Sequence, residues 1–131
     1  MRIVESGLIT EAVRNACIEA NRNLPSDVRD CIRAAREREP WAPARDSLDR
    51  IIENFGIASQ RRFPVCQDTG MACVFVEVGN EAHIEGNLEG AVNEGVRRGY
   101  AEGYLRKSVV ADPLNRKNTG DNTPAMLYVE F

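Results

Sequence analysis

The hydrophobic pattern of this chain changes its period near Gln60, and this change constrains the fold more than any other feature. Before Gln60, apolar residues between positions 8 and 55 recur in three segments at helical spacing. After it, segments 73–78 and 125–131 are rich in β-branched and aromatic residues, which is typical of strands. Helical spacing returns only at 88–100. The sequence therefore predicts an α+β fold, with a helical N-terminal half packed on a small sheet that is mixed or antiparallel.

Capping residues predict where several of these elements begin and end. Ser26 is expected to cap the second helix, and Pro43 suits the first turn of the third helix, which Gly56 should close. Asn87 is expected to cap the fourth helix. The short segment His83–Glu85 reads as a continuation of the strand before it.

Two glycines, Gly95 and Gly99, fall on the apolar face of the fourth helix. A glycine in a helix interior costs roughly 1 kcal/mol relative to alanine. We therefore expect another backbone to pack very close to that face, because a close approach would explain why the side chains are missing.

Composition excludes several classes of function. A length of 131 residues suits one domain, 1–131, and the 43% hydrophobic and 28% charged contents are ordinary for a soluble protein. The net charge of −3 gives no basic footprint for nucleic acid. No apolar run approaches the roughly 20 residues of a membrane span, and no secretory signal is recognisable. We therefore expect a cytoplasmic protein with neither a nucleic-acid nor a membrane partner.

The four cysteines do not form a zinc-type pattern, because the chain has no CxxC pair and only one histidine, His83. Cys17 and Cys31 lie among apolar positions of expected helices. We interpret both as small buried hydrophobic residues.

The run Pro64–Gly70 concentrates more chemistry than any other segment, since it places the thiol of Cys66 beside the carboxamide of Gln67 and the carboxylate of Asp68. Cys66 can be a buried loop cysteine, a nucleophile, or a ligand of a metal or iron–sulfur cluster. A nucleophile usually needs a histidine base, so a ligand fits better if further ligands come from elsewhere. Asp68 can carry a proton, bind a substrate hydroxyl or simply form a turn.

A second polar run spans residues 105–124, and its first charged residue is Arg106, which follows Leu105. Arginine binds carboxylates bidentately, although a surface ion pair is its more ordinary role. The segment Asn118–Pro124 reads as consecutive turns. Its backbone N–H groups can cradle an anion, or the segment is a long solvated loop.

Together these two runs resemble the iron–sulfur hydro-lyases known as class I fumarate hydratases. The stretches that carry the likeness are Cys66–Gly70 with Val74–Gly79, and Leu105–Ala125, and the likeness covers nearly the whole chain. It is strongest to the alpha subunit, or N-terminal region, of two-subunit fumarases. The related L-tartrate dehydratases share the first stretch but are less similar over Ser108–Leu114, which favours a fumarase.

The resemblance implies a [4Fe–4S] cluster and interconversion of (S)-malate with fumarate, a step of the tricarboxylic acid cycle. Cys66 matches the first of three cluster ligands. Gln67 and Asp68 match residues that contact the substrate, and Arg106 matches an arginine that binds a substrate carboxylate. Asp68 is the candidate catalytic residue, either in proton transfer or in orienting the hydroxyl. None of the other cysteines matches the family's remaining ligands.

Phe131 falls inside a segment that reads as a strand, so we expect this chain to be the N-terminal portion of a longer alpha subunit. The remaining cluster ligands would then come from a beta subunit or C-terminal domain, and the chain alone would be inactive. A homo-oligomer is also expected. The alternatives are a component of L-tartrate dehydratase and a non-catalytic N-terminal module.

Overall fold

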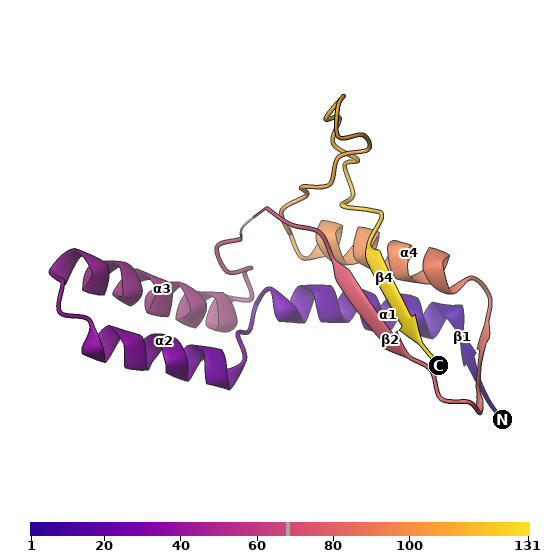
Figure 1. The fold of residues 1–131 in the computed structure, drawn as a ribbon, viewed down its shortest axis with the longest axis horizontal. Helices are drawn as coiled ribbons and strands as arrows, with labels where there is room; N and C mark the ends of the chain where they lie inside the picture. The colour runs from indigo at the N-terminus through magenta and orange to yellow at the C-terminus, as the bar shows by residue number, and fades with distance from the viewer. Residues whose placement is uncertain (68) are drawn as a thin grey trace. The chain divides into compact units, whose positions relative to one another are not determined.

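The computed structural model describes residues 1–67 and 69–131, which form two compact units. We call residues 1–18 with 69–131 the sheet unit and residues 19–67 the hairpin unit. In chain order the elements are β1 (Arg2–Glu5), α1 (Ser6–Ala20), α2 (Ser26–Arg38), α3 (Ala42–Arg61), β2 (Cys73–Glu77), β3 (Ala82–Glu85), α4 (Leu88–Glu102) and β4 (Met126–Glu130) (Figure 1). The predicted α+β class is confirmed.

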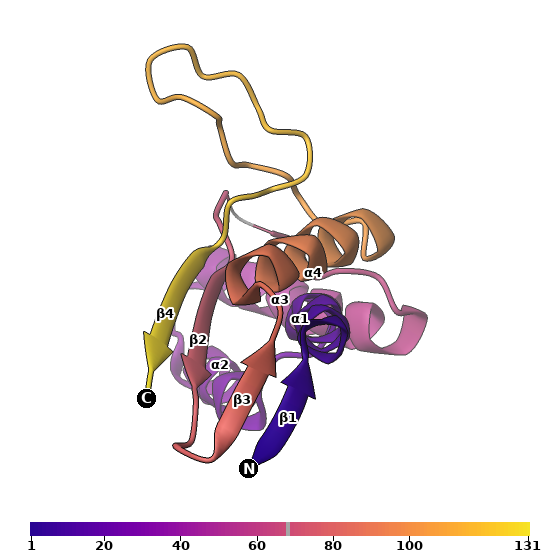
Figure 2. The same ribbon diagram turned by 90° about the vertical axis from the view of Figure 1, so that its right-hand side faces the viewer.

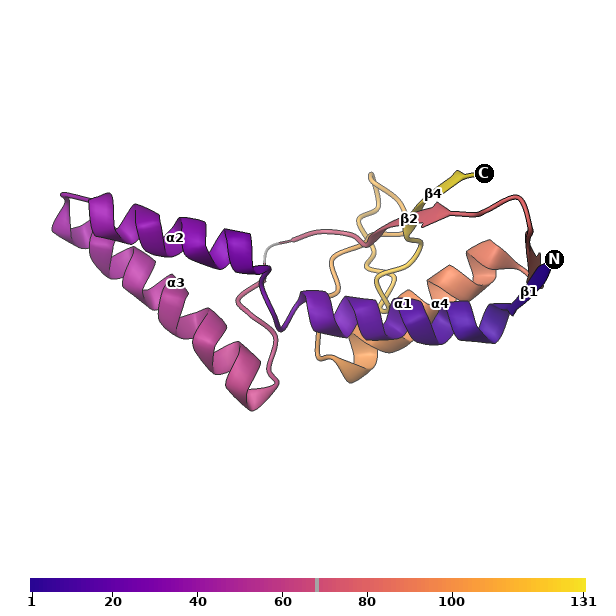
Figure 3. The same cartoon turned by 90° about the horizontal axis from the view of Figure 1, so that it is seen from below.

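The hairpin unit consists mainly of α2 and α3, which lie side by side (Figures 1 and 3). Their contact includes a two-pronged ion pair, in which Nε and Nη2 of Arg36 donate to the Asp49 carboxylate at 2.8 and 3.0 Å. Phe55 is buried on α3, and the Arg33 guanidinium lies 5.6 Å from the centre of its ring. An apolar contact and an ionic contact therefore join the two helices.

The helix boundaries of the hairpin unit correct two predictions. Ser26 is the first residue of α2 and makes no cap, because Pro25 occupies the cap position. Gly56 does not close α3, which continues to Arg61 and ends at the left-handed residue Arg62, φ 57°. A single glycine lowers helix stability without ending a helix whose other residues favour it. The predicted place of Pro43 in the first turn of α3 is confirmed.

Strand pairing in the sheet unit differs from the prediction. The structure has two sheets of two strands each, β1 with β3 and β2 with β4, and both pairs are parallel (Figure 2). The expectation of a mixed or antiparallel sheet was wrong, since each pair is joined by a long stretch of chain that includes a helix. Such crossover connections are what parallel pairing requires. β1 was not predicted, and β3 pairs with it instead of continuing β2.

The core of the sheet unit lies where α1 and α4 cross the inner faces of the strands (Figures 2 and 3). Val13 of α1 is buried against Val92 and Val96 of α4, and Val74 and Leu127 of the β2–β4 sheet pack on this cluster. The other face of that sheet is open, with the exposed rings of Phe75 and Tyr128 stacked at 4.9 Å. The predicted N-terminal helix α1 therefore packs on this core beside the strands.

The glycine prediction for α4 is confirmed. A Cβ atom on Gly95 would lie 2.7 Å from the Thr10 carbonyl oxygen, and one on Gly99 would lie 2.8 Å from the Cβ of Cys17. The predicted cap is confirmed too, since the Asn87 side chain accepts from the backbone N–H of Gly90 at 3.1 Å. The missing side chains thus let α1 and α4 pack backbone against backbone.

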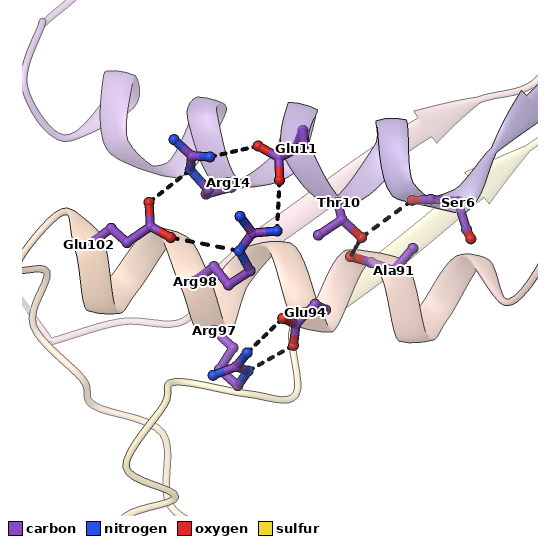
Figure 4. A network of polar contacts seen from close by, with 9 residues as sticks. All are labelled: Ser6, Thr10, Glu11, Arg14, Ala91, Glu94, Arg97, Arg98 and Glu102. Carbon is purple, nitrogen blue, oxygen red and sulfur yellow. Dashed lines mark hydrogen bonds and ion pairs between the residues drawn. The ribbon is translucent and has the colours of Figure 1, made fainter.

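Charged residues form the rim of this helix pair (Figure 4). Arg14 of α1 contacts Glu102 of α4 at 3.0 Å, and Arg98 of α4 contacts Glu11 of α1 at 2.7 Å. All four side chains are partly exposed, so each pair contributes at most about 1 kcal/mol. The rim orients the two helices, while the buried valines supply most of the stabilisation.

The cysteine prediction holds for one residue of two. Cys17 is half-buried and packs against the core, and this burial raises the pKa of its thiol. Cys31 is exposed, so its interpretation as a buried residue was wrong. The reason is that no residue of α2 is fully buried, although the helix packs against α3. Among residues 1–67 and 69–131, no helix combines the length and the apolar content needed to cross a membrane.

Candidate functional site

Cys66 and Gln67 lie in the segment that follows α3, at the end of the hairpin unit. Three hydrogen bonds fix this segment. The Val65 N–H donates to the Asn21 carbonyl at 2.7 Å, the Cys66 N–H donates to Oδ1 of Asn54 at 3.0 Å, and Nε2 of Gln67 donates to Oδ1 of Asn21. The backbone is thus anchored on both α3 and the α1–α2 connection, while the side chain of Cys66 remains exposed.

A cavity of about 390 Å³ opens beside Cys66 within the hairpin unit, lined mainly by apolar atoms. The residues that line it are Leu24, Arg50, Ile51, Asn54, Phe55, Val65 and Cys66. The one cationic side chain among these described lining residues, Arg50, is already paired with Glu53 at 3.0 Å. A dicarboxylate needs more positive charge than this. The residues around the cavity therefore provide an apolar surface beside Cys66 and not a complete binding site for a dianion.

Arg106 belongs to the sheet unit, in the loop that follows α4. Its side chain is exposed. The residue before it is fixed, because Leu105 is buried and its N–H donates to the Tyr100 carbonyl at 3.0 Å. On the other side, Nδ2 of Asn118 donates to the Lys107 carbonyl at 3.0 Å. The backbone on both sides of Arg106 is therefore fixed by hydrogen bonds, at Leu105 and at Lys107. Asp68 lies outside the described residues.

The loop from 105 to 124 is tied together by its own hydrogen bonds. Thr119 bonds to the Val109 carbonyl through both its N–H (2.9 Å) and its hydroxyl (3.3 Å), and Val110 forms a bridge with Asn118. At the far end, Oδ1 of Asp112 accepts from two backbone N–H groups. The loop is thus an irregular hairpin and not a disordered connection.

The predicted anion cradle in Asn118–Pro124 is not available at three of its N–H groups. The N–H of Thr119 donates to Val109, that of Gly120 to Oδ1 of Asn118 at 2.7 Å, and that of Thr123 to Oδ1 of Asp121 at 3.0 Å. Burial alone would raise the pKa of Asp121. The hydrogen bonds from Thr123 and Thr119 outweigh burial and hold that pKa below its usual value. These three backbone N–H groups therefore donate to oxygen atoms of the same loop and are not available to an external anion.

Sequence reasoning missed one residue of this region, Asn122. The sequence places it in a run of turns, yet it is the most buried polar residue described. An asparagine between an aspartate and Thr123-Pro124 looks like any turn residue, and no local signal distinguishes a buried one.

The described residues fit one ligand of an iron–sulfur cluster and not a full set. No group of three His, Cys, Asp or Glu side chains among them is placed to hold a metal ion. Such clusters are held by cysteine thiolates, and the exposed thiol of Cys66 on its anchored backbone suits this role. Cys17 suits it less well, because burial raises the pKa of its thiol.

Comparison with known families decides the assignment of the chain. The sequence profile of the family described as fumarate hydratase (fumerase) matches residues 10–131. This chain belongs to the fumarate hydratase family. The resemblance predicted from Cys66–Gly70 and Leu105–Ala125 is therefore confirmed.

Curated relatives of this fumarate hydratase family member carry two kinds of name. The chain is 36% identical over 74 residues to a Methanocaldococcus jannaschii protein provisionally named L(+)-tartrate dehydratase subunit alpha, covering 56% of the chain and 25% of the relative. It is 36% identical over 69 residues to a Geobacillus stearothermophilus protein provisionally named fumarate hydratase class I, covering 52% and 13%. It is 29% identical over 119 residues to the Escherichia coli K12 L(+)-tartrate dehydratase subunit alpha, covering 88% and 39%. The chain thus spans well under half of each relative's length.

Proposed function

We propose that this chain is the cluster-binding N-terminal part of an iron–sulfur hydro-lyase that interconverts (S)-malate with fumarate and water. The observation that carries the proposal is the exposed thiol of Cys66, held on an anchored backbone directly before Gln67, in a member of this family. Within this proposal, residues 1–131 act as one N-terminal domain of the complete protein.

Cys66 is proposed as one of three cysteine ligands of a [4Fe–4S] cluster. When bound, such a cluster supplies a Lewis acid that makes hydroxide a better leaving group. The other two ligands come from outside this chain, since the other cysteines match no ligand position of the family. The isolated chain is therefore expected to be inactive.

The polar side chains around this ligand are proposed to bind the substrate. Gln67 and Asp68 contact the hydroxy acid, and Asp68 either transfers a proton or orients the hydroxyl. Arg106 binds one carboxylate, for which its planar guanidinium offers two parallel N–H donors. Neutralising the dianion and fixing its orientation lower the barrier to elimination.

A second candidate function is dehydration of L-tartrate. It is favoured by the names of two of the relatives, which are called L(+)-tartrate dehydratase subunit alpha. Malate is preferred here because the stretch Ser108–Leu114 is less like the tartrate enzymes than the fumarases.

The test is an anaerobic assay of the complete, cluster-loaded protein with (S)-malate, fumarate and L-tartrate. A higher kcat/KM for malate than for tartrate supports the proposal, and the reverse order establishes the second candidate. No turnover of any of the three would overturn both and leave the non-catalytic module. Brown colour that appears only when the chain is purified with its partner would identify a split enzyme.

The names of the relatives also support a partner. Since two of those proteins are called alpha subunits, we propose that this chain acts with a beta subunit or a C-terminal domain. We also propose, from the sequence alone, that the enzyme is homo-oligomeric and cytoplasmic. Co-purification with a tagged beta subunit, followed by determination of the mass of the complex, tests this part of the proposal.

A further inference from the structure

Asn122 is a fully buried amide, with 0% of its surface exposed, in a loop whose other residues are mostly exposed. Its backbone is left-handed, with φ at 64°. Asparagine tolerates this conformation better than most residues, but glycine would do so at lower cost. A buried amide also has to find partners for all its polar atoms, so the side chain requires a reason of its own.

The partners of Asn122 come from three separate segments. Its Oδ1 accepts from the backbone N–H groups of Ser108 and, at 3.0 Å, of Val109. Its Nδ2 donates to the carbonyl of Gly70 at 3.4 Å. Its amide is also hydrogen-bonded to the side chain of Tyr100. Burial raises the pKa of Tyr100, and this hydrogen bond lowers it in part. One side chain thus links the end of α4 and both polar runs.

These bonds fix the backbone on the C-terminal side of Arg106. Leu105 is already held through its buried side chain and its bond to the Tyr100 carbonyl. Asn122 holds Ser108, two residues after Arg106, and so the arginine lies between two fixed points. The same amide contacts Gly70, the last residue of the Cys66–Gly70 stretch.

We propose that Asn122 is a positioning residue, which sets the Arg106 segment against Gly70 so that the guanidinium meets the substrate carboxylate in a fixed place. This inference rests on the proposed function of Arg106. A small displacement of such a residue weakens binding strongly, because a bidentate contact depends on orientation. Asn122 itself touches only the protein chain.

Two substitutions at this position separate its contacts. Asn122→Asp keeps an acceptor for Ser108 and Val109 and tolerates the left-handed backbone, but replaces the donor to Gly70 with an oxygen. Asn122→Gly suits the backbone and removes every contact. Asn115→Asp is the matched control, because it makes the same charge change at an exposed residue of the same loop.

The first measurement is amide hydrogen exchange on the complete protein. We expect exchange at Ser108 and Val109 to be at least tenfold faster in Asn122→Gly and nearly unchanged in Asn122→Asp and Asn115→Asp. Unchanged protection in Asn122→Gly would overturn the inference. This measurement needs no activity, so it tests the anchoring even if the enzyme proves to have another substrate.

The second measurement is a double-mutant cycle with Arg106→Lys, at unchanged cluster content. We expect both Asn122 variants to raise KM for malate about tenfold with a smaller effect on kcat, and to add little once Arg106 is already lysine. A purely structural role predicts additive losses, and that result would overturn the inference. A wild-type enzyme that turns over neither malate nor tartrate would instead overturn the proposed function.

Discussion

Gly95 of α4 lies so close to Val13 of α1 that a Cβ atom on the glycine would be 2.7 Å from the Val13 Cβ. The backbone oxygen of Thr10 would also lie at 2.7 Å and Cγ1 of Val13 at 2.9 Å, and neither the Thr10 oxygen nor the Val13 Cβ can rotate away. Overpacking of this kind costs about 1–3 kcal/mol, which exceeds the gain of up to about 1 kcal/mol from replacing a helical glycine. We therefore expect Gly95→Ala to lower the free energy of unfolding, measured by urea denaturation.

Gly56 provides the matched control for this substitution. It lies inside α3, and an added Cβ would meet nothing within 4 Å. Gly56→Ala should therefore raise the free energy of unfolding by about 0.5–1 kcal/mol. If the two alanines stabilised the protein equally, α1 and α4 would not be packed backbone against backbone.

The four cysteines should react with alkylating reagents at different rates in the cluster-free protein. Burial protects the thiol of Cys17 and raises its pKa, whereas Cys31, Cys66 and Cys73 are exposed. Because the thiolate is the reacting form, Cys17 should be modified most slowly at pH 8. Mass spectrometry of timed samples measures the rates, with urea-unfolded protein as the reference. Equal rates for Cys17 and Cys31 in the folded protein would contradict the described core.

The ion pair between Arg36 and Asp49 gives the hairpin unit a pH dependence. The hydrogen bond from Arg36 lowers the pKa of Asp49 below its ordinary value of 3.8, against the opposing effect of burial. A lowered folded-state pKa means that the stabilisation is present above that ordinary value and is lost as the pH falls through the folded value. Asp49→Asn should thus lower the melting temperature at pH 7, and the difference should shrink below pH 3.8.

Glu81→Gln is the control for the Asp49 substitution, since Glu81 is an exposed carboxylate in the turn between β2 and β3. Its effect on the melting temperature should be small at every pH. A constant difference between wild type and Asp49→Asn from pH 7 to pH 2 would show that the ion pair does not act through its charge.

Much of the fold could be predicted from local pattern, and the errors in strand pairing share a non-local cause. Asn87 and the glycines of α4 carry local information about a cap and a close contact. The segment of β1, in contrast, has only four residues and is too short to be recognised as a strand from the sequence. It forms a strand only through its pairing with β3. Parallel pairing of β2 with β4 likewise depends on the path of the chain between them.

The candidate site divides in the same way. The stretches Cys66–Gly70 and Leu105–Ala125 indicate the family through their resemblance to it, which needs no knowledge of the fold. Asn122 could not be found in this way. Its importance depends on burial and on partners 14 and 52 residues away in the chain.

The most direct test of the central claim compares Cys66→Ser with Cys31→Ser in the complete protein, prepared anaerobically. Both cysteines are exposed, so neither change should disturb the core. Visible absorption, iron content and turnover of malate and tartrate are measured together. We predict that Cys66→Ser loses the cluster and the activity, while Cys31→Ser retains both. A Cys66→Ser protein that keeps normal iron content and normal turnover would contradict the account.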